Sequence, residues 1–141
     1  QTINISKNEK EEFQFPVRDI SAGLAAKKLK IPGSLLKMEL NTDHPLCYGM
    51  PETINVFSRG APVFATSVPY FDLDRRVIGT YPEKDILASG YAENVEVLAE
   101  KPAMVWLKKG KGQLVLFGFN PQFRASTSSN YKLLFNGILL K

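Results

Sequence analysis

The sequence has very few of the side chains that usually hold metals or act as nucleophiles. Among 141 residues there is one cysteine, Cys47, and one histidine, His44. A catalytic zinc takes about three protein ligands, and no HExxH motif is present. Asp43 stands beside His44, and His44 and Cys47, even if they met across a turn, would give two ligands at best. We therefore predict no metal and no cofactor in this chain, and a His44 that caps or braces the turn before Pro45.

The lone cysteine is also a weak candidate nucleophile. Reactive thiols sit at helix N-termini or beside a cation, with a base such as His44 to activate them. The residues after Cys47, Tyr48-Gly49-Met50-Pro51, do not begin a helix. The sequence favours a small buried thiol over a thiol hydrolase, and we predict no catalytic residues in this chain alone.

Long apolar runs and clustered charges are missing as well. No run approaches the ~20 residues that span a bilayer, and the lysines behind the net charge of +4 are scattered. We predict no membrane span and no nucleic-acid partner, because nucleic-acid binding needs a clustered basic surface. The Asp72-Leu73-Asp74 segment runs straight into two arginines, unlike a calcium loop. Gly110-Lys111-Gly112 lies between two apolar runs instead of before a helix, so it is a turn and not a phosphate loop.

The composition is that of an ordinary globular domain. Hydrophobic residues make up 44% and charged residues 23% of the chain, and a chain of this length buries roughly two thirds of its surface. Residues 1–12 are polar and charged, which is typical of a linker or tail. We predict a single globular domain over 13–141.

Short alternating apolar runs predict a β-rich fold. We expect strands at 36–40, 54–57, 63–66 and 76–81, a strand signal at 13–17, a short helix within 19–29 that ends by Pro32-Gly33, and a helical turn at 85–89. The runs 103–107 and 113–117 predict a hairpin with a loop over 108–112. Because the run 113–117 is apolar on both faces, we place it inside a sheet.

The last segment predicts an amphipathic helix. Its apolar residues recur at i, i+3, i+4, i+7 and i+8, which puts them on one face that should contact the core, with Thr127 or Ser128 as N-cap. We expect Phe117 and Leu134 to be core residues. The apolar residues of this face are Tyr131, Leu134, Phe135, Ile138 and Leu139.

One loop is a candidate binding site. The segment 118–124 follows the second strand of the hairpin and precedes the helix, and ligands of open α/β sheets bind at such carboxyl ends of strands. Asn120, Gln122 and Arg124 offer amides and a planar guanidinium, which suit a carboxylate or a sugar. The alternative is that these side chains only tie down the loop.

An ordered set of short motifs resembles a known family. The set resembles the C-terminal domain appended to bacterial zinc-carboxypeptidase-like proteins of the carboxypeptidase A type, and it covers roughly residues 31–140. That domain is similar in fold to class I glutamine amidotransferases. The motifs are Ile31-Pro32-Gly33-Ser34, Asp43-His44-Pro45-Leu46, Tyr48-Gly49-Met50-Pro51, Pro62-Val63-Phe64, Gly110-Lys111-Gly112 through Leu116-Phe117-Gly118-Phe119, Pro121-Gln122-Phe123-Arg124 and Leu133-Leu134-Phe135-Asn136.

The resemblance implies a fold and a role, but no catalytic residue. It implies a single α+β or α/β domain that forms part of a glutamine-amidotransferase-like, flavodoxin-like sheet with a C-terminal helix. It also implies that residues 13–141 are the C-terminal portion of a larger, exported protein. There the chain would be a non-catalytic accessory domain beside a peptidase domain of the same parent, where zinc would be bound. His44 is followed by Pro45-Leu46-Cys47, so the His-x-x-Glu pair of the peptidase is absent. An incomplete sheet would leave an edge open to another chain or to a homo-oligomer.

Overall fold

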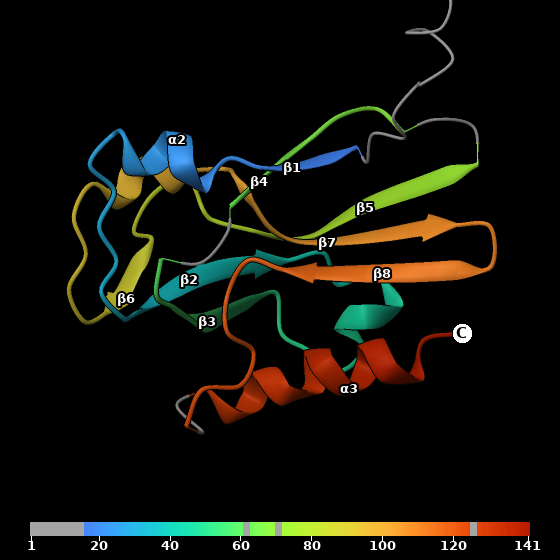
Figure 1. Ribbon diagram of the computed structural model, residues 1–141. Helices are drawn as coiled ribbons and strands as arrows, with labels where there is room; N and C mark the ends of the chain where they lie inside the picture. The colour runs from blue at the N-terminus through green and yellow to red at the C-terminus, as the bar shows by residue number, and fades with distance from the viewer. Residues whose placement is uncertain (1–15, 61–62, 70–71, 125–126) are drawn as a thin grey trace, which may run out of the picture.

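The strands that the structure describes form two antiparallel sheets (Figure 1). The computed structural model describes residues 16–60, 63–69, 72–124 and 127–141. The smaller sheet pairs β1 (Val17–Asp19) with β4 (Phe64–Thr66). The larger has the order β3-β2-β5-β7-β8, with β6 also paired to β2. Its strands are β2 (Ser34–Leu40), β3 (Thr53–Ser58), β5 (Leu73–Thr80), β6 (Leu87–Ser89), β7 (Pro102–Lys109) and β8 (Gly112–Phe117).

The helices of the described residues are few and short. The longest of them is α3 (Tyr131–Leu139), at the C-terminal end. The predictions of a β-rich single domain and of a C-terminal helix are confirmed. Every pair of described strands is antiparallel, whereas a flavodoxin-like sheet is mostly parallel. The other helical elements are α2 (Ser21–Ala25), η1 (Pro45–Cys47), η2 (Val95–Leu98) and η3 (Ser128–Asn130).

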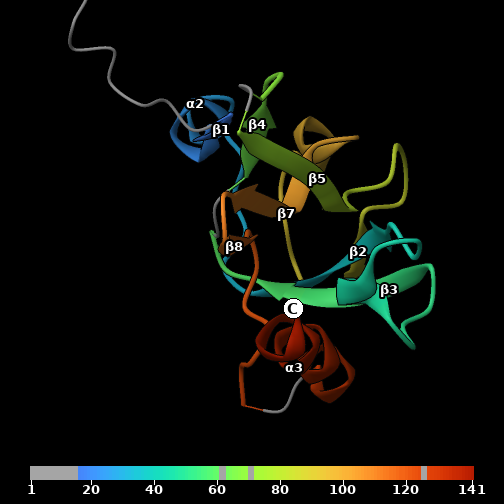
Figure 2. The same ribbon diagram turned by 90° about the vertical axis from the view of Figure 1, so that its right-hand side faces the viewer.

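The larger sheet curls so that its two ends approach each other (Figure 2). The chain leaving β8 meets β3, where the N–H of Asn120 donates to the carbonyl of Phe57 over 3.0 Å. The ring of Phe123 then stacks on the ring of Phe57, with centroids 4.2 Å apart. The curl therefore wraps one face of the sheet around the core and fixes the start of the loop that leads to α3.

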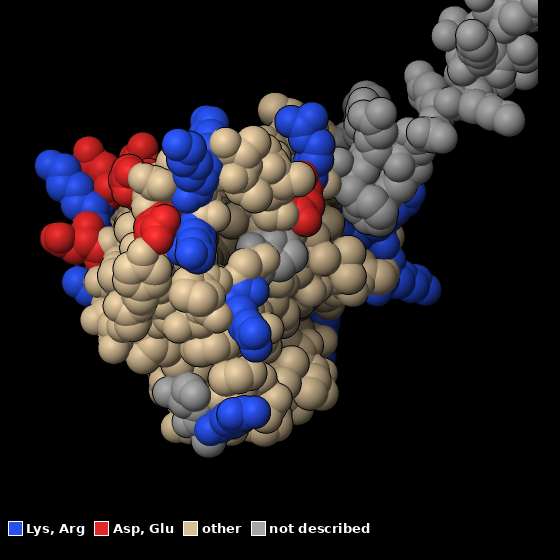
Figure 3. Space-filling view, turned by 60° about the vertical axis from the view of Figure 1, so that its left-hand side comes forward, with Lys and Arg blue, Asp and Glu red and all other residues tan. Residues whose placement is uncertain are grey.

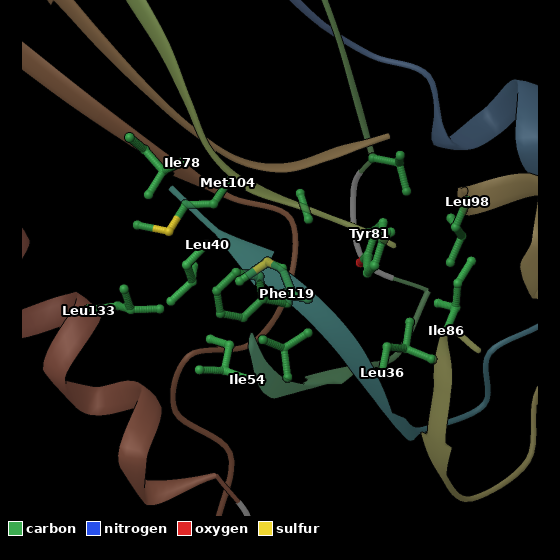
Figure 4. Packing of buried hydrophobic residues seen from close by; sticks show 14 of the residues in the cluster. Leu36, Leu40, Ile54, Ile78, Tyr81, Ile86, Leu98, Met104, Phe119 and Leu133 are labelled. Atoms are coloured by element: carbon green, nitrogen blue, oxygen red, sulfur yellow. The ribbon is translucent and has the colours of Figure 1, made fainter. Parts of the chain in front are cut away.

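The main core lies inside this curl (Figure 4). On β2 the predicted alternation is confirmed, because Leu36, Met38 and Leu40 are buried while Glu39 is exposed. Gly79 on β5 lies so close to Met38 that a Cβ there would stand 2.5 Å from the Met38 sulfur. Side chains from distant elements complete the core, among them Ile54, Ile78, Tyr81, Ile86, Leu98, Met104, Phe119 and Leu133.

Three local predictions differ from the structure. The segment 85–89 contains the strand β6 instead of a helical turn, because residues 87–89 pair with β2. The helix expected within 19–29 spans only Ser21–Ala25, and Lys28, with a left-handed φ of 62°, turns the chain away. The hairpin is confirmed, but its loop is only Gly110-Lys111, with a positive φ at Gly110 as a type II′ turn requires.

The position of β8 is a further correction. Its run of apolar residues predicted a strand inside the sheet, yet β8 is the last strand in the order, and among the described strands only β7 pairs with it. None of its residues is fully buried. Phe117 is therefore half-buried, edge-on to Phe119 at 5.6 Å, instead of a central core residue. Apolar side chains on both faces did not distinguish an internal strand from an edge strand.

The orientation of α3 is the largest correction. The face predicted to contact the core points outward, and Leu133, on the opposite side of the helix, is the residue that is fully buried. The predicted N-cap is wrong too. The helix begins after η3, and neither the Thr127 nor the Asn130 side chain makes a capping hydrogen bond at the start of η3 or α3.

Candidate functional site

His44 has a structural role in the turn that it begins. Its Nδ1 accepts a hydrogen bond from the N–H of Leu46 over 3.2 Å, so it caps η1, as the sequence predicts. Its ring packs against Trp106 with centroids 5.0 Å apart. Partial burial, helped by the positive charge of Arg76, lowers the pKa of His44, and Asp74 opposes this only partly. The imidazole is therefore neutral near pH 7, and the nitrogen that accepts from Leu46 is already in use.

Cys47 lies at the end of the same turn and is buried. Its side chain is 1% exposed, and this burial raises the pKa of the thiol from 9.0 to about 11. A thiol is nucleophilic only as the thiolate, so Cys47 stays protonated and inert at neutral pH. The structure thus agrees with the buried-thiol interpretation and gives no support to a Cys47–His44 hydrolase.

The acidic pair and the glycine turn have simple structural roles. Asp74 lies 3.7 Å from Arg76 in an exposed ion pair, and Gly110 forms the β7–β8 turn. Within residues 16–60, 63–69, 72–124 and 127–141, no three His, Cys, Asp or Glu side chains come together as a metal site. The zinc expected in the parent protein is therefore not assigned to any described residue here.

The loop 118–124 packs mainly on the protein itself. Asn120 uses its backbone to hold β3, and Phe123 covers Phe57. Arg124 is exposed, lies 5.5 Å above the Phe123 ring, and has a left-handed φ of 46°. Gln122 is also exposed. The three predicted ligand-binding side chains lie on one short loop, which the Asn120 backbone and the Phe123 ring hold against β3. Carboxylate or sugar binding by these side chains, and the alternative that the side chains tie down the loop, both stay predictions.

Amide side chains hold the inner face of α3 against the rest of the domain. Asn136 Nδ2 donates to the carbonyls of Leu46 (2.8 Å) and Tyr48 (3.1 Å). Asn130 Nδ2 donates to the carbonyl of Asn55 over 2.9 Å. The helix passes close to η1 at Gly137, where an added Cβ would lie in ordinary van der Waals contact, 3.6 Å from a methyl group of Leu46. Leu133 fills the centre of this contact and is 0% exposed.

The outer face of α3 is an apolar surface without a partner among the described residues. Leu134, Phe135, Ile138 and Leu139 are 37%, 57%, 72% and 74% exposed. Tyr48, on the adjoining turn, is 78% exposed. Figure 3 shows charged side chains gathered on the upper part of the molecule, while the lower part, where α3 lies, is mostly uncharged. Contiguous exposed apolar side chains are typical of protein contact surfaces.

Two open hollows border this helix. One, of ≈ 660 Å³, lies beside its C-terminal end and includes His44, Tyr48, Asn136 and Leu139 among its walls. The other, of ≈ 470 Å³, lies beside its first turns and includes Met50 and Phe135. A contacting protein would therefore find a depression beside each end of the exposed apolar face of α3. Sequence analysis detected the apolar periodicity of this surface but assigned it to the core.

Two further findings concern membrane-spanning helices and similarity to known proteins. In the part of the chain that the structure describes, no helix is both long and apolar enough to cross a membrane. Searches against protein-family models, curated proteins and solved structures found no match to this chain.

Proposed function

We propose that this chain is a non-catalytic accessory domain of a zinc-carboxypeptidase-like protein, and that the outer face of α3 packs against the peptidase domain of that protein. The exposed apolar face carries this proposal. The helix buries Leu133 but exposes Phe135, Ile138 and Leu139. In an isolated domain, the wide apolar face of a surface helix would contact the core instead of the solvent. Covering that face with another domain removes apolar surface from water at about 25 cal/mol per Å².

The motif set of the sequence supports the choice of partner. The residues Leu133-Leu134-Phe135-Asn136 belong to that set, and in the structure two of them hold the helix while the other two are exposed. The proposal includes the exported location of the parent and zinc bound in its catalytic domain. It also includes the finer fold assignment, in which these antiparallel strands are the C-terminal part of an amidotransferase-like domain.

The chemistry of the described residues is compatible with an accessory role. His44 is engaged as a cap and Cys47 is held as the thiol. Each of the two residues best suited to catalysis is thus used to build the η1 turn on which α3 rests. In this interpretation the turn supports the contact surface, and turnover takes place in the partner domain.

The docking role can be tested by placing a charge on the outer face of α3 in the native protein. Ile138→Glu should leave the fold intact, since the side chain is 72% exposed. It should speed the release of a fragment of this size by limited proteolysis, because a buried carboxylate would oppose docking. Val68→Glu is the matched control, since Val68 is 85% exposed and lies between β4 and β5 instead of on α3. Equal release rates for the two variants would contradict the docking role of α3.

A further inference from the structure

The two edges of the larger sheet are treated differently by the rest of the chain. On the β3 edge, the carbonyl of Asn55 accepts from the Asn130 side chain, and the carbonyl of Phe57 accepts from the N–H of Asn120. These outward carbonyls are thus satisfied within the chain. The opposite edge is formed by β8 (Gly112–Phe117), which ends the strand order.

The register of the hairpin defines which β8 groups face outward. The two-residue turn makes Lys109 and Gly112 a hydrogen-bonded pair, and the ladder continues to Phe117 with no bulge. In an antiparallel ladder such pairs alternate, so Leu114 and Leu116 bond to β7. The N–H and C=O groups of Gln113, Val115 and Phe117 therefore point away from β7. Within the described residues, no backbone hydrogen bond reaches them.

The β8 edge lacks the features that normally prevent an edge strand from pairing with a strand of another molecule. The segment 113–117 contains no charged residue and no proline, and its register is regular. Natural edge strands are usually blunted by one of these devices. All six residues of β8 are at least partly exposed, and Leu114 is 43% exposed. An uncharged, regular and exposed edge strand favours pairing with another strand.

We propose that β8 pairs with β8 of a second copy of this chain, antiparallel and about a two-fold axis at Val115. The outward groups are self-complementary in this register. Val115 pairs with its own counterpart, and Gln113 pairs with the counterpart of Phe117, so all three pairs are hydrogen-bonded ones. On the other face, Leu114 lies opposite the counterpart of Leu116, which covers the most exposed leucine of the strand.

The positions of the lysines also favour antiparallel over parallel pairing of the two β8 strands. Lys108, Lys109 and Lys111 gather at the turn end of β8. An antiparallel pair places the two turns at opposite ends of the joint sheet, whereas a parallel pair would bring the lysines of both copies together. Because the carbonyls of Asn55 and Phe57 on the other edge are already bonded, the pairing closes at two copies instead of extending into a fibre. This surface is distinct from α3, and the inference does not rest on the proposed function.

Sedimentation equilibrium of the intact chain tests the proposal. The wild-type protein should reach twice its 15.7 kDa as the concentration rises. Val115→Pro removes an N–H that faces the second copy and none that bonds to β7, so it should give a folded monomer at every concentration. Leu114→Lys should do the same by placing a charge in the joint, without removing any backbone donor. Circular dichroism verifies that both variants remain folded.

Ile138→Glu on α3 is the control, and its mass should match that of the wild type. A wild-type protein that stays monomeric throughout would overturn the proposal. So would a dimer that persists in both β8 variants, or one that Ile138→Glu abolishes, since that would place the contact on α3.

Discussion

Replacing Leu133 by alanine is expected to lower the free energy of unfolding by about 2–5 kcal/mol, the range for a leucine removed from a core. Leu134→Ala, one residue away, should cost about 1 kcal/mol or less, because its side chain is 37% exposed whereas Leu133 is 0% exposed. The reason is geometric. The Leu133 side chain points from the helix into the main core, where truncation leaves a cavity, and Leu134 begins the outer face. Urea denaturation of the two variants measures the difference.

The pair is a matched control because both changes remove the same atoms from the same helix, so helix propensity cancels between them. If Leu134→Ala proved as costly as Leu133→Ala, the helix would be turned the other way. The outer face of α3 would then be core, and the proposed docking surface would disappear.

Cys47 is expected to react with a thiol reagent at least about 100-fold more slowly in the folded than in the unfolded protein near pH 8. Burial raises the thiol pKa from 9.0 to about 11. Each pKa unit cuts the thiolate fraction about tenfold, and only the thiolate reacts. Limited access to a side chain that is 1% exposed adds to this protection. The rate of labelling with and without denaturant, followed by mass, measures the ratio.

The same pKa shift sets a direction for stability. A thiol with a raised pKa in the folded state stabilises the fold fully below pH 9.0, and this contribution is lost as the pH rises toward about 11. Cys47→Ala should flatten that part of the pH profile. Rapid labelling of the folded protein at neutral pH would instead show a reactive thiol, and the hydrolase alternative would have to be reconsidered.

Elements with a single strong local pattern were predictable from the sequence. The alternation of β2 follows from one wet and one buried face. The β7–β8 hairpin follows from two apolar runs around glycines. His44 as the cap of a turn before proline followed from the lack of further ligands. In each case the physical cause lies within a few residues of the chain.

The failures arise where long-range contacts decide. The apolar stripe of α3 is its wider face, yet Asn130 and Asn136 bond to carbonyls of β3 and η1 and turn the other face inward. No periodicity reports those partners. Residues 87–89 extend because β2 offers them an edge. β8 has the composition of an internal strand but pairs with only one of the strands that the structure describes. Each of these depends on what the rest of the molecule, or another molecule, places alongside.

The central claim, that this domain serves as an accessory part of a larger protein, is tested most directly by the size of the native protein. An antibody raised against this chain, used on an extract of the source cells, measures it under denaturing conditions. We expect a band several times larger than 15.7 kDa. A band at 15.7 kDa itself would contradict the accessory-domain account.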